Sequence, residues 1–300
     1  MNKIPVARTV AESYRFTFGG LGTVIGLIWL PIVILTVGGY FTMVPYFSGM
    51  AGALDSGDMS RQAALVLREL AFEIVTIVLL AVVSVAITRE ILNPLKRPSY
   101  LRFALGPAEF RVVGGFVGLF VLMFVFLFAV IIAGVVVGLA VNAALPASAA
   151  AGAGLPNRAV AIAVLIGSLG AIGLVYVFAR LGFLLVPAAV MEGGFGMTRS
   201  WQLTKGNFWR IVLIGLAVLV PITIVAVVAD VAVLGPDFLN PHLELAGDAA
   251  ARTRHSIEQM RQVSAHLPLM MGIGFLLAPF TYGMTFAPAA FAYRALTAKA

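Results

Sequence analysis

RLGFLLVPAAVMEGGFGMTRSWQLTKGNFWR, residues 180 to 210, is the stretch that decides the fold of this chain. It joins two apolar runs through a short polar crossing. Arg180 ends the first run, and Ser200-Trp201 lies ahead of the second. Aromatic and basic residues gather in this way where a helix leaves the hydrocarbon region of a membrane. The stretch therefore predicts an interfacial join between two membrane spans.

The N-terminus repeats this join. Ser13-Tyr14-x-Phe16-Thr17-x-Gly19 aligns without a gap with Ser200-Trp201-x-Leu203-Thr204-x-Gly206. Residues 5 to 18 also carry apolar side chains four apart, at Val6, Val10, Tyr14 and Phe18. We expect this segment to be an amphipathic helix in the headgroup layer. A plain solvated helix is the alternative.

A second copy of the join follows Arg89. After a slip of one residue its order matches the template, with Ser99-Tyr100, Phe103, Gly106, Phe110 and Arg111. Because this segment also holds Pro94, Pro98 and Pro107, it cannot form one continuous helix.

Repetition of this kind indicates repeated structural units. Apolar runs end at Arg89, Arg180 and Arg294. We therefore expect one membrane domain, residues 1–300, built of three tandem units at about 1–91, 92–191 and 192–300. Each unit would be an amphipathic interfacial helix followed by a two-span hairpin. The alternative is that aromatic and basic residues flank these spans as they do in any membrane protein.

The composition is that of a chain whose solvent is lipid, because 61% of the residues are hydrophobic and 11% are charged. Several apolar runs exceed the roughly 18 residues that a helix needs to cross a bilayer. They do not alternate as the strands of a membrane barrel do. We expect an all-α, multi-pass protein whose six spans lie near 19–47, 70–88, 112–145, 159–190, 210–234 and 267–293. The first run begins too late and is too long for a cleaved signal peptide, so it is expected to be a retained anchor.

The basic residues predict the orientation. The termini and joins hold most of the Lys and Arg residues, such as Lys96, Arg97 and Lys205, whereas the opposite loops hold most of the acids. The positive-inside rule then places both termini and all joins in the cytoplasm, as in a bacterial inner-membrane protein. The net charge of +7 is expected to face anionic lipid headgroups rather than nucleic acid.

The residues of catalysis and metal binding are sparse. The chain has no cysteine, which excludes disulfides and thiolate metal sites. No phosphate-binding loop, zinc-protease motif or nucleophile elbow is present. The three histidines lie in one outer loop, with a spacing that matches no metal pattern. We therefore predict no catalytic residue, no metal and no cofactor, and a protein that is not an enzyme.

Three arginines are the candidate binding residues. Arg89, Arg180 and Arg294 stand at equivalent ends of the predicted hairpins. If the units pack around a pseudo-threefold axis, the three guanidinium groups would converge near the cytoplasmic leaflet and bind phosphate bidentately. For Arg180, burial inside the protein and exposure at a helix end are both open.

Other features of the spans give further expectations. Asp230 lies near the outer end of the fifth span, and an acid within a membrane is a functional candidate unless it is simply exposed. Pro31 in the first span frees a carbonyl that a neighbouring helix, a hydroxyl or water should satisfy. Gly114-x-x-x-Gly118 has the spacing that lets helices approach closely. Residues 249 to 265 predict an amphipathic helix outside the sixth span.

The motifs of the chain resemble those of YciC-like bacterial inner-membrane proteins, and of the membrane domain fused in some bacteria to glycerophosphodiester phosphodiesterases. The residues that carry the resemblance are Ser13-Tyr14-Arg15, the run from Pro187 to Gly194, and Ser200-Trp201-x-Leu203-Thr204-x-Gly206-Asn207. The resemblance implies a six-span helical membrane protein. The phosphodiesterase portion has no counterpart here, so its catalysis and its metal are not implied.

Three functions follow as hypotheses. The first is a protein that binds or handles an anionic lipid, or another amphipathic anion, through the three arginines. The second is a transporter, which the repeats and the breaks within spans favour. The third is a scaffolding subunit that binds another membrane protein or a second copy of itself through its small-residue faces.

Overall fold

The computed structural model describes residues 3–93, 103–144, 158–236 and 249–298. Every regular element within these ranges is a helix, and six helices are long and apolar enough to cross a membrane. The all-α, multi-pass prediction is therefore confirmed. In chain order the elements are α1 Val6–Tyr14, η1 Arg15–Gly19, α2 Leu21–Ser56, α3 Met59–Leu92, α4 Pro107–Ala144, α5 Arg158–Gly182, α6 Leu185–Glu192, α7 Met197–Leu203, α8 Phe208–Leu234 and α10 Ala249–Thr297.

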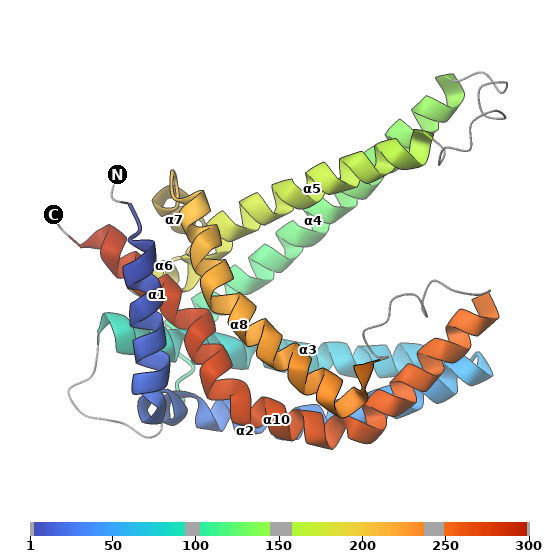
Figure 1. Cartoon of the computed structure of the whole chain (residues 1–300), viewed down its shortest axis with the longest axis horizontal. Coiled ribbons are helices and arrows are strands. Elements are labelled where there is room, and N and C mark those ends of the chain that lie inside the picture. The colour runs from blue at the N-terminus through green and yellow to red at the C-terminus, as the bar shows by residue number, and fades with distance from the viewer. Residues whose placement is uncertain (1–2, 94–102, 145–157, 237–248, 299–300) are drawn as a thin grey trace.

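The long helices form two arms (Figure 1). In one arm α10 packs against α2, α3 and α8. In the other, α4 and α5 pack along each other and diverge from the first arm toward their far end. The short elements α1, α6 and α7 lie at the end where the arms meet, and both chain termini are there too.

α6 sits in the middle of this junction. Its Leu185 and Ala189 pack with α3 and the start of α4, and its Ala188 packs with α8 and α10. The apolar residues after Arg180 therefore enter the core rather than lying along the membrane surface. α6 therefore connects the two arms, because one of its faces packs on α3 and α4 and the other packs on α8 and α10.

The predicted N-terminal helix is present as α1, which continues into the π-helical turn η1. Val6, Val10 and Tyr14 pack on α8 and α10 as the apolar face. A second stripe, which the pattern did not predict, buries Thr9, Ser13 and Thr17.

At Thr17 the buried stripe lets η1 approach α10 closely. A Cβ added at Gly283 of α10 would lie 2.8 Å from the side chain of Thr17. Larger residues on either helix would hold the two apart.

Two spans contain a proline whose freed carbonyl finds a partner. Pro221 of α8 has no N–H, so the carbonyl of Ala217 loses its helical hydrogen bond, and the Tyr14 hydroxyl donates to it at 3.0 Å. In α2, Pro45 frees the carbonyl of Phe41, and an Arg68 N–H donates to it at 2.6 Å. The structure thus shows such partners for Pro221 and Pro45, and the corresponding expectation for Pro31 stays a prediction.

Two glycines of α4 let the segment around the start of α7 pack closely against this helix. A Cβ at Gly114 would lie 2.5 Å from the ring of Phe195, and one at Gly118 would lie 2.8 Å from Met197. The Gly114-x-x-x-Gly118 spacing thus admits side chains from the segment around the start of α7, rather than another long helix.

Several helices extend beyond their apolar runs. The helix expected at residues 249 to 265 is present, and it forms the first part of α10, which runs without a break from Ala249 into the sixth span. α3 begins at Met59, where the Asp58 carboxylate caps it by accepting a hydrogen bond from the Arg61 amide at 3.0 Å. Charged residues at the membrane surface leave the helical hydrogen bonds intact, so a hydropathy pattern does not reveal where such a helix begins.

The join after Arg89 breaks as its prolines predict. α3 ends at Leu92, and Pro107 is the first residue of α4, a position that proline favours. Residues 94–102, which include the Ser99-Tyr100 copy of the motif, lie outside the described part of the chain.

Candidate functional site

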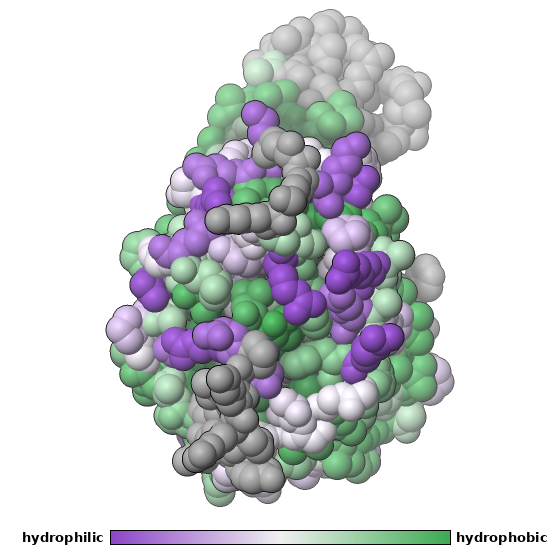
Figure 2. Space-filling model, turned by 90° about the vertical axis from the view of Figure 1, so that its left-hand side faces the viewer, coloured by the Kyte–Doolittle hydropathy of each residue, from purple (hydrophilic) through white to green (hydrophobic). Residues whose placement is uncertain are grey.

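The junction of the two arms forms a polar face. Figure 2 shows hydrophilic side chains spread over this end of the molecule, with apolar surface between them. The three candidate arginines belong to the helix ends near this junction. Each of them contacts a different element.

Arg180 is buried, with 7% of its surface exposed. Its guanidinium stacks on Trp201 with 3.7 Å between Cζ and the ring centroid. Its N–H groups donate to the Trp201 carbonyl at 2.7 Å, the Tyr176 hydroxyl at 2.9 Å and the Thr204 hydroxyl at 3.4 Å. The Ser200 hydroxyl in turn donates to the Arg180 carbonyl at 2.7 Å. Burial rather than snorkelling is therefore the outcome, and Arg180 fastens α5 to α7.

Arg89 binds Glu109, the acid in the first turn of α4. The Nη1–Oε1 distance is 2.9 Å, and Glu109 is 3% exposed. The other carboxylate oxygen accepts a hydrogen bond from the Gly106 amide at 3.0 Å. Glu109 thus caps α4 and fastens α3 to it, although Arg89 itself stays half exposed.

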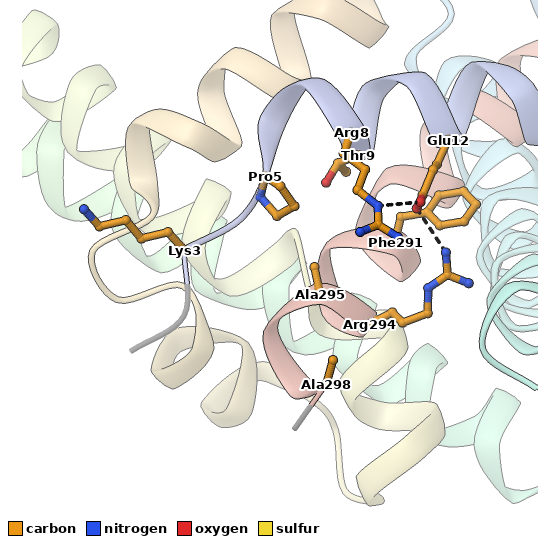
Figure 3. Close-up of a pocket in the computed structure, with 9 residues that line it drawn as sticks. All are labelled: Lys3, Pro5, Arg8, Thr9, Glu12, Phe291, Arg294, Ala295 and Ala298. Atoms are coloured by element: carbon orange, nitrogen blue, oxygen red, sulfur yellow. Dashed lines mark hydrogen bonds and ion pairs between the residues drawn. The ribbon is translucent and has the colours of Figure 1, made fainter. Parts of the chain in front are cut away.

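Arg294 is the candidate that faces a pocket. Its Nη2 lies 3.0 Å from Oε2 of Glu12, and Nε of Arg8 lies 2.8 Å from the other oxygen of the same carboxylate. Figure 3 shows Glu12 held between the two guanidinium groups, one from α1 and one from α10. The side chains of Arg8 and Arg294 are 75% and 47% exposed, so both remain open to a ligand.

The space beside this cluster is a cavity of about 530 Å³ between the two ends of the chain, here called the terminal pocket. Lys3 lies at its other end, with its ammonium group turned away from Glu12 (Figure 3). Phe291 forms an apolar part of the wall, and Arg294 lies over its ring at 4.9 Å. The full lining is Lys3, Pro5, Arg8, Thr9, Glu12, Phe291, Arg294, Ala295 and Ala298.

The charge state of Glu12 follows from its partners. Partial burial alone would raise the pKa of this carboxyl group. The hydrogen bonds and charges of Arg8 and Arg294 outweigh burial and hold the pKa of Glu12 below its ordinary value. Glu12 is therefore ionised at neutral pH, and both guanidinium groups are tied to it.

The N-terminal segment is fixed where it forms the pocket wall. Ile4 is fully buried. Its amide donates to the Asn207 side chain at 3.0 Å, and its carbonyl accepts a hydrogen bond from Arg210 at 2.7 Å. The first residues described are thereby docked on the start of α8.

The three arginines share a pattern of contacts without sharing a site. Arg89 contacts the join that follows it, Arg180 contacts the next join, and Arg294 contacts the N-terminal helix. No hydrogen bond or ion pair within the described ranges connects two of them to a common partner.

The acid Asp230 is half-buried on α8. In the described part of the chain it forms no hydrogen bond or ion pair. The structure therefore gives it no role in the terminal pocket.

Pattern reasoning missed Glu12 and Arg8 as members of the site. Arg8 and Glu12 are four residues apart within α1, and this spacing in the sequence is enough to predict their ion pair. Its meeting with Arg294 spans 282 residues of sequence, and no local pattern reports such a contact. Comparison with protein-family models, with curated proteins and with solved structures finds no match to this chain.

Proposed function

We propose that this protein is a non-enzymatic, YciC-like inner-membrane protein that binds an anionic lipid, or another amphipathic anion, at the cytoplasmic leaflet. The observation that carries the proposal is the terminal pocket. It places Lys3, Arg8 and Arg294 around one cavity with a single carboxylate, Glu12. Exposed guanidinium groups are the side chains best suited to bind phosphate bidentately.

The size and position of the terminal pocket support this function. Its volume of about 530 Å³ falls in the range of small-molecule sites. It lies at the end of the bundle that the basic residues assign to the cytoplasm, where anionic headgroups are concentrated. Of the three candidate arginines only Arg294 is kept as a binding residue, because Arg180 is buried and Arg89 does not line the terminal pocket.

We also infer that three tandem units close into a ring. Each terminal arginine contacts the join of the next unit, and Arg294 of the last unit contacts Glu12 of the first. This order supports the repeat assigned from the sequence. It also explains why the binding pocket lies where the first and last units meet.

Native mass spectrometry of the purified protein tests the proposed site. Arg294→Ala is expected to retain phosphatidylglycerol about 2- to 5-fold less than wild type, the effect of one partly exposed ion pair. Lys205→Ala is the matched control, because it removes an exposed cation from the α7–α8 turn and should leave retention unchanged. Equal retention by wild type and Arg294→Ala would remove the basis of the proposal.

A further inference from the structure

We propose that the terminal pocket selects phosphomonoester groups over phosphodiesters. The inference rests on the proposed function and gives its ligand class. The monoester could belong to a lipid such as phosphatidic acid or to a water-soluble compound. Both present the same dianionic phosphate.

The charges around the pocket match a dianion. Lys3, Arg8 and Arg294 supply three positive charges, and Glu12 supplies one negative charge. The two arginines and Glu12 together carry a net charge of +1, and Lys3 at the other end of the pocket raises the net charge of the lining to +2 at neutral pH. A phosphomonoester carries about 1.5 to 2 negative charges at pH 7, whereas a diester carries one.

The hydrogen-bond donors also favour a terminal phosphate. Arg8 and Arg294 each give one N–H group to Glu12, and a guanidinium has five. Lys3 adds an ammonium group on a flexible chain. A terminal phosphate offers three strong acceptor oxygens to such donors, and a diester offers only two that are not esterified.

The cavity has room for more than the phosphate itself. Phe291, Ala295 and Ala298 give one side of the pocket an apolar wall. The organic part of an ester can lie along this wall while the phosphate faces the arginines. The pocket is also open toward solvent, so no buried charge has to be neutralised before a ligand binds.

The experiment uses the full chain in phosphatidylcholine nanodiscs. Native mass spectrometry measures retention of phosphatidic acid and of phosphatidylglycerol with matched acyl chains, and a thermal-shift titration with glycerol 3-phosphate tests the water-soluble source. We expect wild type to prefer phosphatidic acid about 5-fold, since one extra charge pair near 4 Å is worth about 1 kcal/mol in water. The preference should weaken at pH 5, where the monoester loses charge.

Variants of the lining residues distinguish a failure of the monoester inference from a failure of the proposed function. Lys3→Ala and Arg294→Ala should each reduce the preference, and Glu12→Gln should strengthen retention of both lipids, while Lys205→Ala changes nothing. Equal retention of the two lipids that Arg294→Ala abolishes would overturn the monoester inference and leave the proposed function standing. Retention that is equal in wild type and Arg294→Ala would overturn both. A shift with glycerol 3-phosphate alone would support the monoester class and identify its source as soluble.

Discussion

At the scale of single residues, two kinds of arginine share the polar face. The guanidinium group of Arg180 lies in the protein interior without a carboxylate partner in the described ranges, and it contacts an aromatic ring and three oxygen acceptors. Arg294 instead shares a carboxylate with Arg8 at the surface. Burial makes the first residue structural, and exposure leaves the second available to a ligand.

Replacing Arg180 with lysine should destabilise the fold. An ammonium group cannot make the forked set of hydrogen bonds or the same stack on Trp201, so the expected loss is about 1–3 kcal/mol. Thermal unfolding in detergent measures it. Arg89→Lys is the control, because a lysine at this half-exposed position can still pair with Glu109, so the loss should be less than about 1 kcal/mol. If Arg180→Lys unfolded at the same temperature as the wild type, this would contradict the role of Arg180 in fastening α5 to α7.

The ion pairs of Glu12 should respond to acid. A carboxyl group whose pKa is lowered in the folded state stabilises that state above its ordinary pKa, near 4.3, and this contribution is lost as the pH falls through the lowered value. Protection of α1 amides from hydrogen exchange should therefore fall below about pH 4. Glu12→Gln should show lower protection that does not change over this step. If amide protection of α1 depended on pH in the same way in wild type and Glu12→Gln, the loss of protection could not be assigned to Glu12.

At the scale of elements, the short helix α1 supplies a hydrogen bond that the long apolar helix α8 lacks. Pro221 leaves the carbonyl of Ala217 without its helical partner, and Tyr14 from α1 supplies the missing donor. The contact connects residues 203 positions apart. It shows how a short amphipathic helix can satisfy a carbonyl that a proline leaves free within a long apolar helix.

A double-mutant cycle tests this contact. Tyr14→Phe should cost about 0.5–1.5 kcal/mol, because a hydroxyl donor is lost and the carbonyl is left without a partner. In a Pro221→Ala background the helix regains its own N–H at that position, and Tyr14→Phe should then cost almost nothing. Equal costs in the two backgrounds, measured by thermal unfolding, would rule out the proposed link.

At the scale of the whole molecule, the sequence predicted the six spans because apolar length is a local property. It did not predict that α3 begins as early as Met59, or that the helix expected from residue 249 continues into the sixth span, since polar turns next to an apolar run remain helical. It singled out Arg294 as a candidate binding residue by its place at the end of a predicted hairpin. The terminal pocket itself arises from contact between residues 3–12 and the last turns of α10, which only the folded chain brings together.

The central claim is a multi-pass bundle whose termini and polar face lie in the cytoplasm. Because the chain has no cysteine, single replacements report sidedness directly. In right-side-out membrane vesicles, a membrane-impermeant thiol reagent should label Asp58→Cys, in the turn between α2 and α3, and spare Lys205→Cys until the vesicles are opened. Labelling of Lys205→Cys in sealed vesicles, with protection of Asp58→Cys, would place the terminal pocket on the outer side and contradict the account.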